Sequence, residues 1–104
     1  MILTTSSFII GKNIIKTFAL VRGNTIRARH LGKDIIAFFK NLAGGEIEEY
    51  TKLMAEAREQ AIDRMIEQAK ALGANAIIDV RFSTSYIMGA ASEILAYGTA
   101  AIMD

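Results

Sequence analysis

Apolar side chains recur with helical spacing over residues 46–72. At about 100° per residue, one stripe collects Tyr50, Met54, Ala57, Ala61, Met65, Gln68 and Leu72. Three glutamates fall in the first turn and Lys70 in the last, which suits the helix dipole, and Gly73 stands where a C-terminal glycine is expected. The pattern predicts a long helix over residues 46–72.

This apolar stripe is wider than one sheet face requires. Ile62, Ile66 and Ala69 extend it on one side, and Leu53 and Ala71 lie beyond its opposite edge. A helix packs its apolar surface against another element, so the extra width indicates a second covering surface. We expect a partner subunit to supply it.

Four segments have the composition of β-strands: residues 3–10, 14–22, 75–86 and 93–103. Apolar residues occupy both faces of the second segment, which is typical of a strand covered on both sides. In the third segment the even positions from Ala76 to Tyr86 form one face, and Ile77, Asp79 and Arg81 belong to the other. The first two strands are joined by a turn at Gly11-Lys12-Asn13.

The stretch between the second strand and the long helix is the least regular. Gly23-Asn24 begins a polar, basic loop, and Asp34 can cap a short helix over residues 35–42. We therefore predict one α+β domain over residues 1–104, with a mostly antiparallel sheet of two N-terminal and two C-terminal strands, packed by a short and a long helix.

The glycine pair Gly44-Gly45 precedes the long helix and has two interpretations. Glycines at a helix start can cradle a phosphate, but that chemistry usually adds a Lys and a Ser or Thr. Here Glu46, Glu48 and Glu49 follow, and their carboxylates would repel phosphate from the positive helix end. A tight turn between two helices is the favoured interpretation.

Composition points to self-association. The 104 residues are 52% hydrophobic and 22% charged, with no Pro, Trp or Cys, which is more apolar surface than a small monomer readily hides. The absence of Cys excludes disulfides, thiolate metal sites and cysteine nucleophiles. We expect a cytoplasmic protein, because no apolar run is long enough to span a bilayer and no basic region precedes the first apolar residues.

Charge is divided unevenly along the chain. Residues 1–45 carry seven Lys or Arg and one Asp, and residues 46–104 carry five Lys or Arg and ten Asp or Glu, so the halves have net charges of +6 and −5. The balance favours an acidic face meeting a basic one, within or between subunits. The basic stretch 22–33, with Arg22, Arg27, Arg29, His30 and Lys33, lacks the interleaved aromatic residues of a nucleic-acid site, which argues against nucleic-acid binding.

Few side chains suit a metal or a reaction centre. His30 is the one histidine, so a site with several histidines would need several subunits. Glu56, Glu59, Asp63 and Glu67 line the polar face of the long helix, where solvent, nearby lysines or a hard cation such as Mg²⁺ could offset their repulsion. Arg58 and Gln68 lie on or beside the apolar side, as interface or pocket groups.

The stretches GGEIEEYTKLMAEAREQAIDRMIEQAKALGANAIIDVRF and SEILAYGTA resemble the YbjQ family, whose members are small proteins labelled heavy-metal-binding and without characterised function. The resemblance covers nearly the whole chain and includes Tyr50, Arg58, Glu93, Tyr97 and Gly98. It implies an α+β subunit in a ring, a homopentamer, with helices packed against sheets and the strands of neighbours joined. It implies no activity.

The sequence thus predicts a homo-oligomeric binding or structural module, with a small-ligand or metal-ion site at its subunit interfaces. The ligand-binding candidates are the polar groups nearest apolar walls: Tyr50, Arg58, Arg81 and Glu93. Two alternatives stay open. One is an enzyme acting across the interface, with Glu93, Tyr97 or His30 as acid or base, and the other is nucleic-acid binding through residues 22–33.

Overall fold

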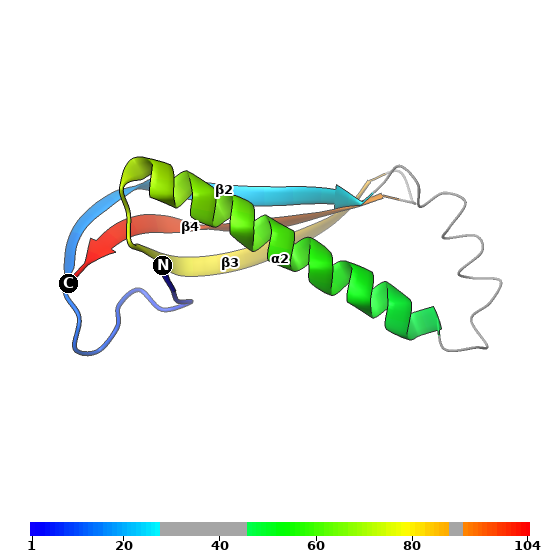
Figure 1. Cartoon of the computed structure of the whole chain (residues 1–104), viewed down its shortest axis with the longest axis horizontal. Coiled ribbons are helices and arrows are strands. Elements are labelled where there is room, and N and C mark those ends of the chain that lie inside the picture. Colours follow the sequence, from blue (N-terminus) through cyan, green and yellow to red (C-terminus); the bar gives the residue numbers. More distant parts are fainter. Residues whose placement is uncertain (28–45, 88–90) are drawn as a thin grey trace.

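The computed structural model describes residues 1–27, 46–87 and 91–104. The elements are β1 (Ile2–Leu3), β2 (Ile14–Arg27), α2 (Glu46–Leu72), β3 (Ala76–Ile87) and β4 (Ala91–Met103). The sheet has the order β1-β3-β4-β2, in which β4 pairs antiparallel with β2 and β3, and β1 pairs parallel with β3. Helix α2 lies across one face of this sheet (Figure 1).

The C-terminal end of α2 is closed by a glycine in the left-handed region. Gly73 has φ 89°, the Gly73 N–H donates to Lys70 O at 3.0 Å, and the Ala74 N–H donates to Ala69 O at 3.1 Å. These are the two bonds of a Schellman motif, which satisfies carbonyls that the helix leaves unpaired. The chain can therefore turn within three residues from α2 into β3.

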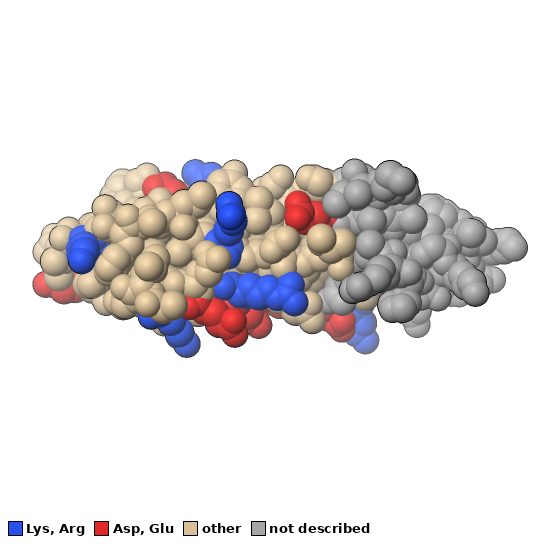
Figure 2. Space-filling model, turned by 90° about the horizontal axis from the view of Figure 1, so that it is seen from above, with Lys and Arg blue, Asp and Glu red and all other residues tan. Residues whose placement is uncertain are grey.

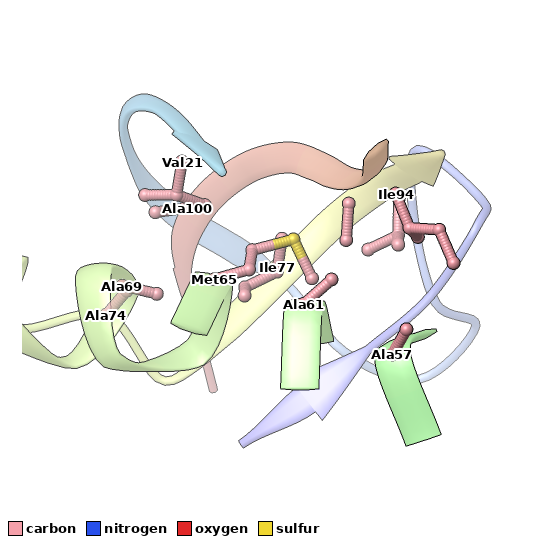
Figure 3. Packing of buried hydrophobic residues seen from close by; sticks show 11 residues of the cluster. Val21, Ala57, Ala61, Met65, Ala69, Ala74, Ile77, Ile94 and Ala100 are labelled. Carbon is pink, nitrogen blue, oxygen red and sulfur yellow. The ribbon is translucent and has the colours of Figure 1, made fainter. Parts of the chain in front are cut away.

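The core lies between α2 and the sheet. The helix contributes Ala57, Ala61, Met65 and Ala69, which are fully buried, and the sheet contributes Val21, Ile77, Ile94, Ala96 and Ala100 (Figure 3). Since most of the helix residues are small, the backbone of α2 can approach the sheet closely.

The closest approach is at Gly23 of β2. A Cβ atom there would lie 2.1 Å from Ala61 O and 2.4 Å from Met65 N, so the position admits only glycine. Two residues further along β2, the hydroxyl of the buried Thr25 donates to Ala57 O at 3.1 Å. Strand β2 is thus fixed on the helix by backbone contact as well as by apolar burial.

A β-bulge in β3 receives the N-terminal segment. Asp79 has φ 55°, which is uncommon for a residue with a side chain. The Asp79 N–H donates to Ser6 O and the Val80 N–H to Thr4 O, both at 3.0 Å, while the Ser7 hydroxyl donates to the Asp79 carboxylate at 2.7 Å. Residues 4–7 therefore follow the outer edge of β3 beyond β1.

Much of the expected architecture is confirmed. Helix α2 has the predicted bounds, Gly73 ends it, and the pairing of β4 with β2 and β3 is antiparallel. The short helix at residues 35–42, the Gly44-Gly45 turn and the residues Arg29, His30 and Lys33 lie outside the described residues.

The first strand and the sheet type differ from the prediction. Only Ile2–Leu3 pairs as a regular strand, whereas residues 3–10 were expected to do so. This pair is parallel to β3, so the sheet is mixed. The physical reason is the bulge at Asp79. There the N–H groups of Asp79 and Val80 donate to Ser6 O and Thr4 O outside the regular strand pattern, which ends the β1–β3 ladder.

The prediction of a loop beginning at Gly23-Asn24 is wrong, because β2 continues to Arg27. Burial alternates without a break through Val21, Gly23 and Thr25, which face α2. The expectation that this strand is covered on both sides also fails among the described residues. Ile15 and Leu20 are each 61% exposed.

The even face predicted for β3 changes sides at the bulge. Ile78 packs in a small cluster with Ala76 and Met103, whereas Val80 packs in the main core against α2. One extra residue between Ile78 and Arg81 exchanges the two faces of the strand. Arg81 is therefore on the side of the sheet away from the helix.

Candidate functional site

The sheet face opposite α2 carries the candidate site. Residues next to the helix-facing positions must project to the other side, since side chains alternate along a strand. Three rows of directly paired residues cross β2, β4 and β3 there, and we call them the open face: Arg22–Tyr97–Arg81, Asn24–Leu95–Ser83 and Ile26–Glu93–Ser85.

The open face has a half-buried centre and exposed flanks. Glu93, Leu95 and Tyr97 on the central strand β4 are half-buried, and the β2 and β3 members of each row are exposed. Directly opposite side chains in a sheet have Cβ atoms about 5 Å apart. Each β4 side chain is therefore within contact range of two neighbours from different strands.

Arg81 is held in place by the N-terminal segment. Its Nη1 donates to Thr5 O at 2.8 Å and to Val80 O at 2.9 Å. Gly98 of β4 lies against the β3 bulge that precedes Arg81. A Cβ at Gly98 would lie 2.7 Å from the Ile77 side chain and 2.9 Å from Ile78 O, so glycine leaves room for the bulge. The bulge, Gly98 and residues 4–7 together set the position of the Arg81 guanidinium.

Arg22 is held through its backbone instead. The Arg22 N–H donates to Gln68 Oε1 at 2.9 Å, and Arg64 Nη1 donates to the Asn24 carbonyl oxygen. These two α2 side chains thus cap the outer edge of the middle of β2. The Arg22 guanidinium is exposed and makes no hydrogen bond or ion pair with another described residue.

Glu93 is the one carboxylate on the open face. Its Oε2 accepts a hydrogen bond from Asn24 Nδ2 at 3.1 Å. Glu93 lies two rows away from the two arginines, and no ion pair joins them in the described structure. The open face therefore combines two guanidinium groups, a phenol and one carboxylate that accepts a hydrogen bond from a side-chain amide.

Of the four predicted ligand-binding residues, the structure places two on the open face, two rows apart. Arg81 and Glu93 both lie on the open face, while Arg58 is exposed on α2, which covers the opposite face. Tyr50 belongs to the N-terminal part of α2, and its side chain is outside the described part. Gln68, predicted to be an interface or pocket group, instead caps the edge of β2.

Sequence reasoning missed Arg22, Asn24 and Ser83 as neighbours of this site. Arg22 was predicted at the end of the second strand and Asn24 in the loop after it, because Gly23 interrupts the apolar pattern. The available signal was the alternation of Val21, Gly23 and Thr25, in which a glycine can occupy a buried strand position where another backbone approaches.

The donor set does not fit a heavy-metal ion. The chain has no Cys and one His, so it lacks the soft ligands that such ions prefer. Within residues 1–27, 46–87 and 91–104, no group of three or more His, Cys, Asp or Glu side chains could hold a metal ion. The four acidic residues of the polar helix face are exposed and do not converge.

No helix in the described part of the chain is both long and apolar enough to cross a membrane. The cytoplasmic location stays a prediction.

Comparisons with known sequences give matches over nearly the whole chain. The YbjQ family model, described as "Putative heavy-metal-binding", matches residues 1–104. A UPF0145 protein of Dehalococcoides mccartyi is 59% identical over 104 residues, covering all of both chains. One from Methanosarcina acetivorans is 54% identical over 100 residues, which is 96% of this chain and 94% of the relative.

A solved structure has the same fold. It is the crystal structure of a protein of unknown function from Pediococcus pentosaceus, assigned to the DUF74 family. The TM-score is 0.65 at 18% sequence identity, with 100% of this chain and 98% of the other covered. At this identity the likeness supports the fold alone.

Proposed function

The chain belongs to the YbjQ family, and from this premise we propose that it is the subunit of a closed homo-oligomer that serves as a binding or structural module. Neighbouring subunits join through the edges of their sheets. The observation that carries this proposal is the exposed apolar edge formed by the first half of β2.

This apolar edge comprises residues 14–20 of β2. Ile14 is 38% exposed, and Ile15 and Leu20 are each 61% exposed. Of the described strands only β4 pairs with β2, so its outer backbone groups in this region have no strand beside them. The caps from α2 reach only Arg22 and Asn24. An exposed apolar edge is a template for pairing with another chain.

The second open edge belongs to β3 and differs from the first. Strand β1 and residues 4–6 cover β3 as far as Val80, but no described strand pairs with the outer edge of residues 81–87. Two unlike edges favour head-to-tail contacts, in which β2 of one copy joins β3 of the next. Such contacts produce a ring if the rotation closes, and the homopentamer implied by the family resemblance is the ring size that we adopt.

Charge is compatible with the same association. The exposed positions of α2 that the structure describes carry four acidic and four basic side chains, while Arg22 and Arg81 of the open face are basic and exposed. Seen from the β2 side, Asp and Glu gather mainly along one margin, with Lys and Arg among them (Figure 2). The basic side chains of the open face can pair with acidic side chains of another copy.

Native mass spectrometry of the full chain, with size-exclusion light scattering at several concentrations, tests the assembly. The wild-type mass is expected to be a fixed multiple of 11.4 kDa. Leu20→Lys should dissociate the oligomer, because it places a charge in the proposed interface between β2 of one copy and β3 of the next. Leu72→Lys is the matched control, since Leu72 is an exposed apolar residue (43%) at the end of α2, and it should retain the assembly. A wild-type monomer at all concentrations would refute the proposal.

A further inference from the structure

We propose that Arg64 and Gln68 of α2 select the part of β2 that another copy can join. Their side chains close the outer edge of β2 at residues 22–24 to strand addition and confine pairing to residues 14–20. This inference rests on the assembly proposed above and adds the residues that determine its interface. Both are positioning residues, because they act through the strand edge that they cover.

The two helix residues match the strand edge in spacing and in chemistry. Arg64 and Gln68 are one turn apart, which is about 6 Å along a helix. Backbone groups that point to one edge of a strand recur every two residues, or about 6.7 Å. Gln68 Oε1 accepts from the Arg22 N–H at 2.9 Å, and Arg64 Nη1 donates to the Asn24 carbonyl oxygen. One acceptor thus meets a backbone donor, and one donor meets a backbone acceptor.

The close packing of α2 on β2 places these side chains at the edge. A Cβ at Gly23 would lie 2.1 Å from Ala61 O and 2.8 Å from Arg64 Cβ, so the helix passes directly beside residues 22–24. A strand added here would have to replace two hydrogen bonds and cover the Arg64 guanidinium. Charged side chains at a sheet edge oppose such pairing.

The edge of β3 is also covered over part of its length. Residues 4–7 accept hydrogen bonds from the Asp79 and Val80 N–H groups and from the Arg81 guanidinium. Each edge of the sheet therefore has one covered stretch and one open stretch. Among the described strands, the open stretches are residues 14–20 of β2 and 81–87 of β3.

The two open stretches lie at opposite ends of the sheet. Residues 14–20 pair with residues 99–103 of β4, whereas residues 81–87 pair with residues 91–97. An interface between the open stretches therefore offsets each copy from the next along the strand direction. Without the α2 side chains, residues 22–24 would allow other registers, including β2 of one copy paired with β2 of another. A single assembly requires that such alternatives cost more than the intended contact.

Native mass spectrometry and sedimentation velocity of Arg64→Ala/Gln68→Ala test the inference. Wild type should form one species, a fixed multiple of 11.4 kDa, whereas the double variant should form at least two, because its uncovered edge permits more than one register. Arg58→Ala is the matched control, since Arg58 is another exposed arginine of α2, and it should form the wild-type species. Arg64→Lys/Gln68→Glu keeps a donor and an acceptor and should also form the wild-type species.

Two further measurements separate the edge from the rest of the fold. Gln68→Ala should speed hydrogen exchange of the Arg22 amide about fivefold, because one hydrogen bond is lost. Leu20→Lys blocks the open stretch of β2, so adding Arg64→Ala and Gln68→Ala to it should restore association through residues 22–24. Circular dichroism checks that these variants, all at exposed positions, remain folded.

Several outcomes would overturn the inference. In one, the double variant forms the same single species as wild type although its Arg22 amide exchanges faster, so that the uncovered edge adds no strand. Unchanged exchange of this amide in Gln68→Ala, or the same mixture of species in Arg58→Ala, would overturn it as well. A wild-type monomer that associates after both alanine substitutions would refute the assembly proposed above and support the role of the two side chains. A wild-type oligomer unaffected by them would do the reverse.

Discussion

The two faces that β2, β3 and β4 form differ in the side chains they carry. Toward α2, side chains are small or apolar, and a glycine allows β2 to contact the helix backbone. On the open face the same strands present arginines, polar side chains and a half-buried tyrosine. One face specifies the fold, and the other is available for recognition.

The difference also shows in how polar groups are satisfied. The buried Thr25 hydroxyl has a partner on the helix. The Arg22 guanidinium on the open face has no partner among the described residues. Polar groups that the fold leaves unpaired on an ordered surface are candidates for ligand or partner contacts. The contrast predicts that substitutions facing α2 affect stability, whereas those on the open face affect binding.

The largest effect is expected from Gly23→Ala. The new methyl group would overlap the Ala61 carbonyl and the Met65 amide, which belong to helix backbone and cannot turn aside. We expect a loss of about 4 kcal/mol or more in the free energy of unfolding, measured by denaturant titration at fixed protein concentration.

Ser83→Thr is the control for Gly23→Ala, since it adds a methyl group to an exposed open-face position. It should change the free energy of unfolding by no more than about 0.5 kcal/mol. If Gly23→Ala were equally mild, the close packing of β2 on α2 would be wrong.

Thr25→Val should have an intermediate effect. The substitution keeps the shape of the side chain and removes the hydroxyl that donates to Ala57 O at 3.1 Å. A loss of about 1 kcal/mol in the free energy of unfolding is expected for one hydrogen bond. Thermal and denaturant unfolding would measure it.

Thr99→Val is the comparison for Thr25→Val. Thr99 is half-buried on β4, and its hydroxyl makes no hydrogen bond with another described residue. The change should be neutral or slightly stabilising, because Val favours strands. Equal losses at the two positions would remove the distinction between the bonded and the unbonded threonine.

The elements that the sequence predicted well are those with local signals. Helix α2 has charges that suit its dipole, a broad apolar stripe and a terminal glycine, so its bounds follow from neighbouring residues alone. The continuation of β2 through Gly23 depends on the backbone of Ala61, which is 38 residues away in sequence. Local patterns cannot report such a contact.

The same distinction applies to the candidate site. Arg81 and Glu93 were found because both lie in segments with a clear strand pattern. Arg22 was predicted as the last residue of its strand, directly before an expected loop, so its neighbours across the sheet were not predicted. Arg58 was placed beside the apolar side of the helix from its phase, but at the margin of the stripe a small rotation decides between burial and exposure. The bulge at Asp79, which brings Arg81 beside Tyr97, leaves no local signal in a regular alternation.

The smallest effect on stability is expected from Glu93→Gln on the open face. Gln keeps an oxygen that can accept from Asn24 Nδ2, and only the charge is lost from a hydrogen bond of 3.1 Å at a partly solvated site. The free energy of unfolding should change by no more than about 0.5 kcal/mol. Asn24→Ala, which removes the donor, should be similarly mild. A loss above about 1 kcal/mol for Glu93→Gln would mean that this carboxylate is structural, and the open face would then contribute to the fold in the same way as the face that α2 covers.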